Sequence, residues 1–426
     1  MVDVAKVRMF GQNIGTFVWD DSYRVARFEY DNDFVGKGIE PSPIMMPVQQ
    51  GRIYSFGSLN WDTFNGLPGM LADSLPDTYG RALFDQWLIL TGRTTSNPVE
   101  SLCFLGQRCM GALEFEPATG PSSDANMKFE IDTLIDVARE ALSKKKDFGV
   151  NLDVDRKAAI AEILRLGTSA GGQRAKAIIA YNKETGEVRS GQISAPEGFD
   201  YYLIKLDGVT AEAGFKETEN FGRLEYSFSE LVKNCGIDMT ECSLIEENGR
   251  AHFLTKRFDR ENGRKIHMQT LCGMAHYDFR LKNGHSYEQA FNVMRRLRLP
   301  YSQAQEMFRR IVFNVVVRNQ DDHTKNISFL MDSSGQWSLS PAYDMGFAYN
   351  PLGAWTATHQ MSINGKFDNI TRADLLSLAN ANNIKNASEI IDQVCETTAG
   401  WPDLAKNCGV PQKMIDGIVP HMLLSI

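Results

Sequence analysis

The sequence predicts an α+β chain with two lobes, of which the first is rich in strands and the second is all helical. Short alternating runs separated by turns fill residues 1–262, which is the pattern of strands with one buried face. After residue 263 the apolar residues repeat with a helical period, most clearly over 287–299 and 304–319. Polar residues suited to a reaction occur in both halves, so we expect the site to draw on both lobes.

The composition favours a globular protein and argues against several other classes. At 426 residues the chain has room for two or three domains. The net charge of −8 argues against a nucleic-acid binder, because phosphate contacts need clustered Lys and Arg. The seven cysteines form no CxxC pair, which is typical of reduced thiols. There is no run of about 18 apolar residues and no apolar leader, so we expect a cytoplasmic protein.

Residues 1–120 are expected to form a first, strand-rich subdomain. Its predicted elements are strands at 4–10, 16–20 and 23–30, a helix over 74–92 and a strand over 111–117. The stretch 117–126 is rich in Pro, Gly, Ser and Ala, as linkers are, and it places a boundary near residue 120. The rest of the first lobe then covers 121–262, and the second lobe covers 263–426.

A glycine-rich stretch at 167–176 suits a nucleotide phosphate. It follows helices predicted over 130–142 and 154–166 and precedes a strand. Gly167, Gly171 and Gly172 would let backbone N–H groups approach phosphate oxygens that side chains would obstruct. The stretch is not a Walker A loop, because the chain has no GxxxxGK[ST] sequence.

Lys205 stands between apolar neighbours in a strand predicted over 199–208. Burial of an unpaired lysine is costly, so a functional Lys205 needs an anionic partner. Glu225 on the following helix is the natural partner, and Glu219 and Glu230 are alternatives that the spacing leaves open.

The densest polar cluster lies between the apolar runs 311–317 and 327–331. Buried polar groups in such a place are costly unless they are paired or bind a metal. Four residues separate Asp321 from Asn326, and Asp344 follows a predicted hairpin. A kinase-type site places its base, its metal-binding amide and its second metal ligand in this order.

This order suggests roles for the charged residues of the cluster, for Asn326 and for Asp344. Asn326 and Asp344 would bind Mg²⁺, which prefers one or two carboxylates with other oxygen ligands. Asp321 would accept a hydroxyl proton, with Asp322 as an alternative base. Lys325 would stabilise the transferred phosphoryl group. We interpret His323 as a structural residue.

Taken together, these motifs resemble the HipA family of bacterial Ser/Thr kinases, the toxins of HipBA-type toxin–antitoxin pairs. The resemblance covers nearly the whole chain. The matching segments are SLPDTYGR at 74–81, GTSAGGQRAK at 167–176, YYLIKL at 201–206, LEYSFSEL at 224–231, FLTKRFDR at 253–260, DDHTKN at 321–326, SPAYDM at 340–345 and HQMSINGK at 359–366.

The resemblance implies a two-lobed, protein-kinase-like fold that uses ATP and Mg²⁺. It supports Asp321 as the base, Asn326 and Asp344 as metal ligands, and Lys205 as a contact of the ATP phosphates. It also implies that the hinge residues lie along adenine and ribose; these are Lys256, Arg257, Phe258 and Asp259. Lys256 departs from the Glu of many relatives, which leaves adenine recognition to backbone groups.

The family's activity implies a regulatory step on the glycine-rich loop. Its loop serine is autophosphorylated, which switches the kinase off, and that serine corresponds to Ser169. Thr168 beside it is a second acceptor that the sequence leaves open.

The resemblance also implies partners for the chain. The substrate would be a cytoplasmic protein, in relatives an aminoacyl-tRNA synthetase. A helix-turn-helix antitoxin of the HipB type would bind the chain, and DNA would be contacted only through it.

Two other functions are considered. A co-repressor with little or no kinase activity is one, motivated by arginines that would face DNA or a partner at 295–298, 309 and 310. A small-molecule kinase is the other, but such sites carry an HxD order, whereas here Asp precedes His.

Overall fold

The computed structural model describes residues 2–76, 78–121, 174–191, 195–210 and 220–426, together with Ile131 and Ile135. The chain forms two compact units. The first consists of Met1–Ile39, Val48–Gly222 and Ser243–His267, and the second of Glu40–Pro47, Arg223–Cys242 and Met268–Ile426. The predicted division at residues 120 and 262 stays a prediction. The mixture of helices and strands confirms the predicted α+β class.

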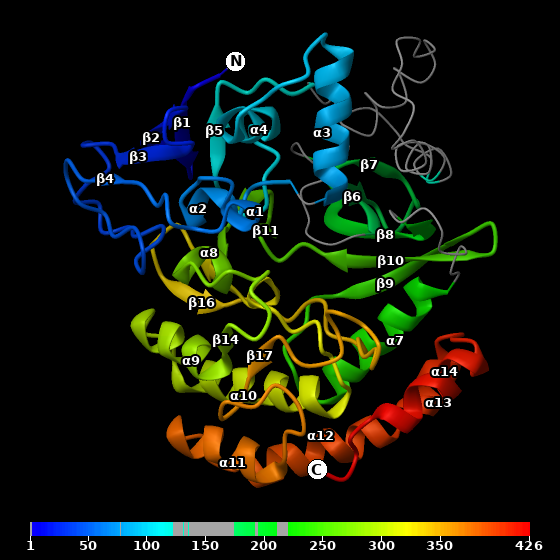
Figure 1. Cartoon of the computed structure of the whole chain (residues 1–426). Helices are drawn as coiled ribbons and strands as arrows, with labels where there is room; N and C mark the ends of the chain where they lie inside the picture. The colour runs from blue at the N-terminus through cyan, green and yellow to red at the C-terminus, as the bar shows by residue number, and fades with distance from the viewer. Residues whose placement is uncertain are drawn as a thin grey trace. The chain divides into compact units, whose positions relative to one another are not determined.

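An antiparallel five-stranded sheet begins the first unit, in the order β4-β3-β2-β1-β5. Figure 1 draws it in blue to cyan. Alternate residues of β1 and β3 are buried, as the sequence period predicts. Its strands are β1 (Val4–Met9), β2 (Gln12–Asp20), β3 (Val25–Tyr30), β4 (Ile53–Tyr54) and β5 (Glu114–Glu116). Its helices are α1 (Trp61–Phe64), α2 (Gly69–Ala72), α3 (Thr78–Leu90) and α4 (Pro98–Leu105).

A second five-stranded sheet has the order β7-β6-β8-β10-β9. Its strands are β6 (Arg174–Tyr181), β7 (Val188–Ser190), β8 (Asp200–Thr210), β9 (Cys242–Glu247) and β10 (Arg250–Lys256), and the small hairpin of β11 (Arg260–Glu261) and β12 (Arg264–Lys265) follows. Asn248 and Gly249 join β9 to β10 with positive φ angles of 49° and 77°. An Asn-Gly pair favours such a hairpin turn, because both residues tolerate that conformation.

The second unit is mainly helical. Its helices are α7 (Phe221–Asn234, which begins in the first unit), α8 (Leu271–Ala275), α9 (Tyr287–Arg296), α10 (Tyr301–Val316), α11 (Arg372–Ala381), α12 (Ala387–Ala399), α13 (Trp401–Asn407) and α14 (Gln412–Ile418), with the 3-10 turns η1 (Thr324–Asn326) and η2 (Val419–His421). Helix α10 packs against α9 and α12. Thr371 caps α11 in a capping box with Asp374, and the Thr-Arg-Ala-Asp sequence suits this motif.

The second unit is not all helical, contrary to the prediction. A three-stranded sheet has the order β13-β15-β16, built from β13 (His267–Thr270), β15 (Ser328–Met331) and β16 (Trp337–Leu339). A parallel pair joins β14 (His285–Ser286) to β17 (Met361–Ser362). The antiparallel pair of β15 and β16 agrees with the hairpin that the sequence predicts before Asp344. The other strands of this unit have two to four residues, which is too short to show a period.

Helix α10 carries the chain into the polar cluster. Ile311, Val312 and Phe313 are fully buried, and so are Val315 and Val316. The helix therefore ends inside the second unit, where the next residues must find partners for their polar groups. The polar cluster begins three residues later, at Asn319.

Candidate active site

The loop between α10 and β15 is held by hydrogen bonds from other segments of the second unit. Thr324 Oγ1 donates to the carbonyl of Tyr277 over 2.7 Å. The Tyr343 hydroxyl donates to the carbonyl of Lys325 over 2.7 Å, and it also bonds with Ser328. The tyrosine beside Asp344 thus fixes the backbone of the loop that carries Asp321.

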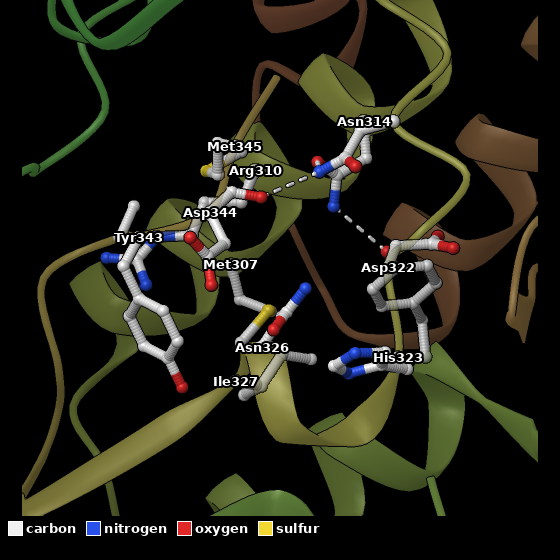
Figure 2. Close-up of a pocket in the computed structure, with 13 residues that line it drawn as sticks. Met307, Arg310, Asn314, Asp322, His323, Asn326, Ile327, Tyr343, Asp344 and Met345 are labelled. Atoms are coloured by element: carbon white, nitrogen blue, oxygen red, sulfur yellow. Dashed lines mark hydrogen bonds between the residues drawn. The ribbon is translucent and has the colours of Figure 1, made fainter. Parts of the chain in front are cut away.

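Asn326 and Asp344 line the same pocket, which Figure 2 shows. The pocket has a volume of about 400 Å³, including its open mouth. The amide nitrogen of Asn326 donates to the carbonyl of Asp321 over 2.8 Å. Because the NH₂ group is used in this way, the amide oxygen is the atom that Asn326 can offer to a cation.

Asp344 has a left-handed backbone, with φ of 51°. Asp adopts this conformation more readily than most non-glycine residues, so it suits the turn that ends here. Within the described residues no group of three or more His, Cys, Asp or Glu side chains could hold a metal. One carboxylate and one amide are nevertheless a donor set that suits Mg²⁺, which takes its remaining ligands from water and phosphate.

The Asp321 carboxylate is fixed by an indole. Trp355 Nε1 donates to Asp321 Oδ1 over 2.6 Å, and His323 Nε2 lies 3.9 Å from the same oxygen. Partial burial, together with the charges of Asp344 and Asp322, raises the pKa of Asp321 above its ordinary value. Its side chain remains 46% exposed, so solvent limits this effect.

His323 is held in an aromatic environment. Its ring lies edge-on to Phe279, with 5.3 Å between the ring centroids, and Lys325 Nζ lies 4.9 Å from the centre of the same Phe279 ring. Burial lowers the pKa of His323, which favours the neutral imidazole. The interpretation of His323 as structural stays a prediction that these contacts support.

Asp322 has the surroundings of a structural carboxylate. Its side chain is 1% exposed. Oδ2 accepts from Tyr287 Oη over 2.7 Å and is 2.8 Å from His359 Nδ1, while Oδ1 accepts from the backbone N–H of Gln360 over 2.8 Å. Both oxygens are therefore engaged, and the geometry favours Asp321 over Asp322 as the base.

A chain of hydrogen bonds continues from Asp322 to Asp344. Tyr287 Oη accepts from Asn314 Nδ2 over 3.1 Å, and Asn319 Nδ2 donates to Asn314 Oδ1 over 2.9 Å. Asn319 Nδ2 also lies 3.3 Å from the carbonyl of Asp344. The two asparagines thus connect Tyr287, the partner of Asp322, to the backbone of Asp344. Neither asparagine is among the site residues predicted from the sequence, although an Asn within the apolar run 311–317 was a signal for such a role.

Lys205 lies in β8 of the first unit. Its register neighbours are Lys176 on β6 and Phe253 on β10, and its Nζ is 5.7 Å from the centre of the Phe253 ring. Lys176 is 3% exposed. The two lysines are therefore opposite each other in the sheet, and the role of Lys205 as a phosphate contact stays a prediction.

The three glutamates that the sequence suggests as partners of Lys205 differ in what the structure shows of them. Glu230 pairs with Lys233 over 2.9 Å. Glu219 lies outside the described residues. Glu225 lies in the first turns of α7, and its pairing with Lys205 stays a prediction.

The hinge segment that follows β10 contains a buried ion cluster. Asp259 is fully buried and accepts two hydrogen bonds from Arg257, over 2.8 and 2.7 Å, and one from Arg260 over 2.9 Å. The backbone N–H of Gly111 also donates to it over 2.6 Å. These contacts favour a structural role for Asp259 and Arg257, because the carboxylate that was expected near a ribose is already saturated.

The two other hinge candidates lie nearer the surface. Lys256 pairs with Asp200 over 2.7 Å, and Phe258 is half-buried. Their expected place along adenine stays a prediction.

Residues 167–173 of the glycine-rich loop lie outside the described residues. The expected roles of Thr168, Ser169, Gly171 and Gly172 therefore stay predictions.

Four of the five arginines considered as a partner-facing patch bond to this chain. Arg295 donates to Asn382, Arg296 to the carbonyl of Ile44, and Arg310 to Glu306. Arg309 donates to the carbonyl of Cys235 and to Gln393. These bonds give the four arginines contacts within the chain itself, so they do not favour a patch that faces DNA or a partner.

Two family models match the chain. The "HipA N-terminal domain" matches residues 5–116, and the "HipA-like C-terminal domain" matches residues 168–401, which is more than half of the chain. The chain belongs to the HipA family. This finding confirms the resemblance that the sequence motifs show.

Among curated proteins, the HipA-family chain resembles a "Putative kinase" of Haemophilus influenzae, with 29% identity over 136 residues that cover 28% of this chain and 39% of the relative. It also resembles "Putative kinase Y4dM" of Sinorhizobium fredii, with 27% identity over 218 residues, 46% of this chain and 52% of the relative. The matched part thus spans about half or less of these curated relatives.

A solved structure shares the fold of the HipA-family chain. It is a complex of Shewanella oneidensis HipA with HipB and its operator DNA, matched with a TM-score of 0.66 and 17% identity over 98% of this chain and 94% of the other. This likeness confirms the predicted α+β, HipA-like fold. Among the described residues, no helix is long and apolar enough to cross a membrane.

Proposed function

We propose that this HipA-family chain is an ATP-dependent serine/threonine protein kinase. The observation that carries the proposal is the meeting of Asn326 and Asp344 at one pocket, with Asn326 bonded to the carbonyl of Asp321. Two oxygen donors for a cation thus lie beside a carboxylate that can accept a proton. The names of the two curated relatives support a kinase activity in general.

In the proposed reaction the acceptor hydroxyl gives its proton to Asp321 and its oxygen forms a bond to the γ-phosphorus of ATP. The bond between that phosphorus and the bridging oxygen of the β-phosphate breaks, and ADP leaves. Asn326 and Asp344 would hold Mg²⁺, which neutralises phosphate charge when bound. Lys205 would contact the phosphates, and Lys325 would stabilise the charge on the transferred group.

We extend the proposal to autophosphorylation of the glycine-rich loop. Ser169 is the expected acceptor by family resemblance, and Thr168 is the alternative. Gly171 and Gly172 would supply backbone N–H groups to ATP. Phosphorylation adds about two negative charges, which would oppose binding of another phosphate in the same loop.

The proposed partners follow from the family. The Shewanella HipA is in a complex with HipB and operator DNA. We therefore propose a HipB-like helix-turn-helix antitoxin as a partner, with DNA contacted only through it. The proposed substrate is a cytoplasmic protein, of which an aminoacyl-tRNA synthetase is the family's example, and the proposed location of the chain is the cytoplasm.

Transfer of ³²P from [γ-³²P]ATP tests the proposal. The wild-type chain should become labelled in the presence of Mg²⁺, whereas Asp321→Ala should lose labelling. Asp403→Asn, an exposed carboxylate at the start of α13, is the matched control and should behave as wild type. Equal labelling of the wild type and Asp321→Ala would contradict the assigned base. Absence of labelling in every variant would favour the alternative co-repressor function.

A further inference from the structure

The indole of Trp355 bonds to the carboxylate that we propose as the base. Its Nε1 donates to Asp321 Oδ1 over 2.6 Å, although 34 positions separate the two residues in the chain. Trp355 belongs to the segment that follows the proposed metal ligand Asp344. A hydrogen bond to an ionised acceptor is stronger than one between neutral groups, so this contact can hold the carboxylate in one orientation.

The two oxygens of the Asp321 carboxylate have different surroundings. Oδ1 receives the indole N–H and is also the oxygen nearest to His323. Oδ2 has no hydrogen-bond partner in the part of the chain that the structure describes. The Asp321 side chain is 46% exposed, and its backbone carbonyl accepts from Asn326. Asp321 is thus held at its backbone and at one oxygen, while the other oxygen remains accessible.

Trp355 is itself held by Gln360, which also contacts Asp322. Gln360 Nε2 donates to the Trp355 carbonyl over 2.7 Å, and the Gln360 backbone N–H donates to Asp322 Oδ1 over 2.8 Å. Because Asp322 is the chain neighbour of Asp321, these contacts form a closed path. A side chain whose own backbone is fixed in this way can orient a second group.

We propose that Trp355 is the positioning residue of the base. It fixes Asp321 through Oδ1, so that Oδ2 alone accepts the proton of the acceptor hydroxyl. The effect on proton transfer rests on the proposed kinase function. The terminal torsion of an aspartate is broad and two-fold, so a carboxylate without this contact would present either oxygen over a range of angles. Proton transfer requires that the carboxylate oxygen lie within hydrogen-bond distance of the hydroxyl and be aligned with it. A carboxylate that samples many angles meets these requirements less often.

Substitution Trp355→Phe separates this role from simple packing, because it keeps a ring and removes the N–H donor. Trp337→Phe is the matched control, since Trp337 also lies in the second unit and its Nε1 donates to the Glu40 carbonyl over 3.2 Å. We expect kcat for phosphoryl transfer to fall roughly tenfold in Trp355→Phe. A loss of this size is part of what a general base contributes to the rate, because Asp321 itself remains. The KM for ATP should stay unchanged, and Trp337→Phe should keep the wild-type kcat.

A spectroscopic readout tests the hydrogen bond without activity. The chain has six tryptophans, so a deuterated, ¹⁵N-tryptophan-labelled protein gives at most six indole N–H signals. The signal lost in Trp355→Phe belongs to Trp355. It should move upfield in Asp321→Ala, because the charged acceptor is gone, whereas the Trp337 signal should stay in place.

The outcomes distinguish this inference from the proposed function. A Trp355 signal that moves in Asp321→Ala, together with a reduced kcat in Trp355→Phe, supports the positioning role. A signal that does not move overturns the inference, whatever the activity of the chain. A signal that moves while Trp355→Phe keeps its kcat also overturns it. If the signal moves but the wild type transfers no phosphate, the held carboxylate is supported, and the kinase function and the catalytic part of the inference are overturned.

Discussion

His359 Nδ1 lies 2.8 Å from Asp322 Oδ2, and both side chains are buried, with exposures of 3% and 1%. Since a carboxylate can only accept, the imidazole donates through Nδ1. The pair joins the segment after Asp344 to the loop that carries Asp321. This buried contact fixes the loop at Asp322, while the side chain of Asp321 remains accessible.

Substitution Asp322→Asn should destabilise the second unit. Three donors, from Tyr287, His359 and the Gln360 backbone, meet this carboxylate, and an amide offers only one oxygen to them. A buried donor without a partner costs about 1–3 kcal/mol, so thermal unfolding should begin several degrees lower. Asp392→Asn removes a carboxylate that is 64% exposed and paired with Arg372, and it should change the melting temperature little. Equal melting temperatures of the two variants would refute the structural role of Asp322.

Substitution Asn326→Ala should raise the Mg²⁺ requirement of phosphoryl transfer. The change removes an amide oxygen from the proposed cation site and also the hydrogen bond to the Asp321 carbonyl. Loss of a group that holds or orients a metal ligand typically costs about 10–100-fold in affinity. Titration of activity with Mg²⁺ at saturating ATP measures the effect. An unchanged half-saturating Mg²⁺ concentration would show that Asn326 is not a ligand.

The pH profile of kcat/KM should show an acid limb above the ordinary aspartate range. Partial burial and the neighbouring carboxylates raise the pKa of Asp321, and only its deprotonated form can accept a proton. As the pH falls through this raised pKa, activity should decline, beginning above the usual value of about 3.9. Initial rates across a pH series with a constant concentration of Mg·ATP provide the measurement. A profile that stays flat down to pH 4 in a folded chain would contradict this assignment.

Substitution Asp259→Asn should destabilise the first unit by about 3 kcal/mol, because it leaves Arg257 and Arg260 as buried charges without their anion. Although burial opposes ionisation, the two arginines hold the pKa of Asp259 well below its ordinary range. A carboxyl group with a depressed folded-state pKa contributes stability that is complete above its unfolded pKa, about 3.9, and is lost as the pH falls toward the folded value. The stability difference between wild type and variant should therefore be full at pH 7 and decrease below about pH 4.

Urea unfolding at several pH values measures this difference. Arg27 and Asp20 form a comparable pair near the surface of the first sheet, and Asp20→Asn serves as the control with a small expected effect. A difference between wild type and Asp259→Asn that grows as the pH falls from 7 to 3 would contradict the predicted sign.

The sequence predicts much of the local structure, because local patterns decide it. The Asn248-Gly249 hairpin follows from two residues that tolerate positive φ, and the start of α11 follows from the Thr371 capping box. The placement of Asn326 after an apolar helix follows from the spacing of the polar cluster. These features depend on a few neighbouring residues, so they can be recognised without the fold.

The remaining features depend on contacts between distant residues. Trp355 meets Asp321 across 34 positions, and His359 meets Asp322 across 37. No pattern of neighbouring residues predicts such contacts. The pairing that makes β15 the middle strand of a sheet has the same origin, because β13 lies far from it in the sequence. The adjacent residues Asp321 and Asp322 look alike in sequence, and only their burial and partners separate a candidate base from a structural carboxylate.

The most direct measurement of the central claim is the intact mass of the purified chain before and after incubation with Mg·ATP, followed by peptide mapping. If the chain is a self-phosphorylating kinase, the wild type should carry one phosphate on the peptide that contains Ser169, and Ser169→Ala should lose it. The Asp321→Ala chain should remain unmodified. A wild-type chain that gains no phosphate, either on itself or on any supplied protein, or an Asp321→Ala chain that gains as much as the wild type, would contradict the account.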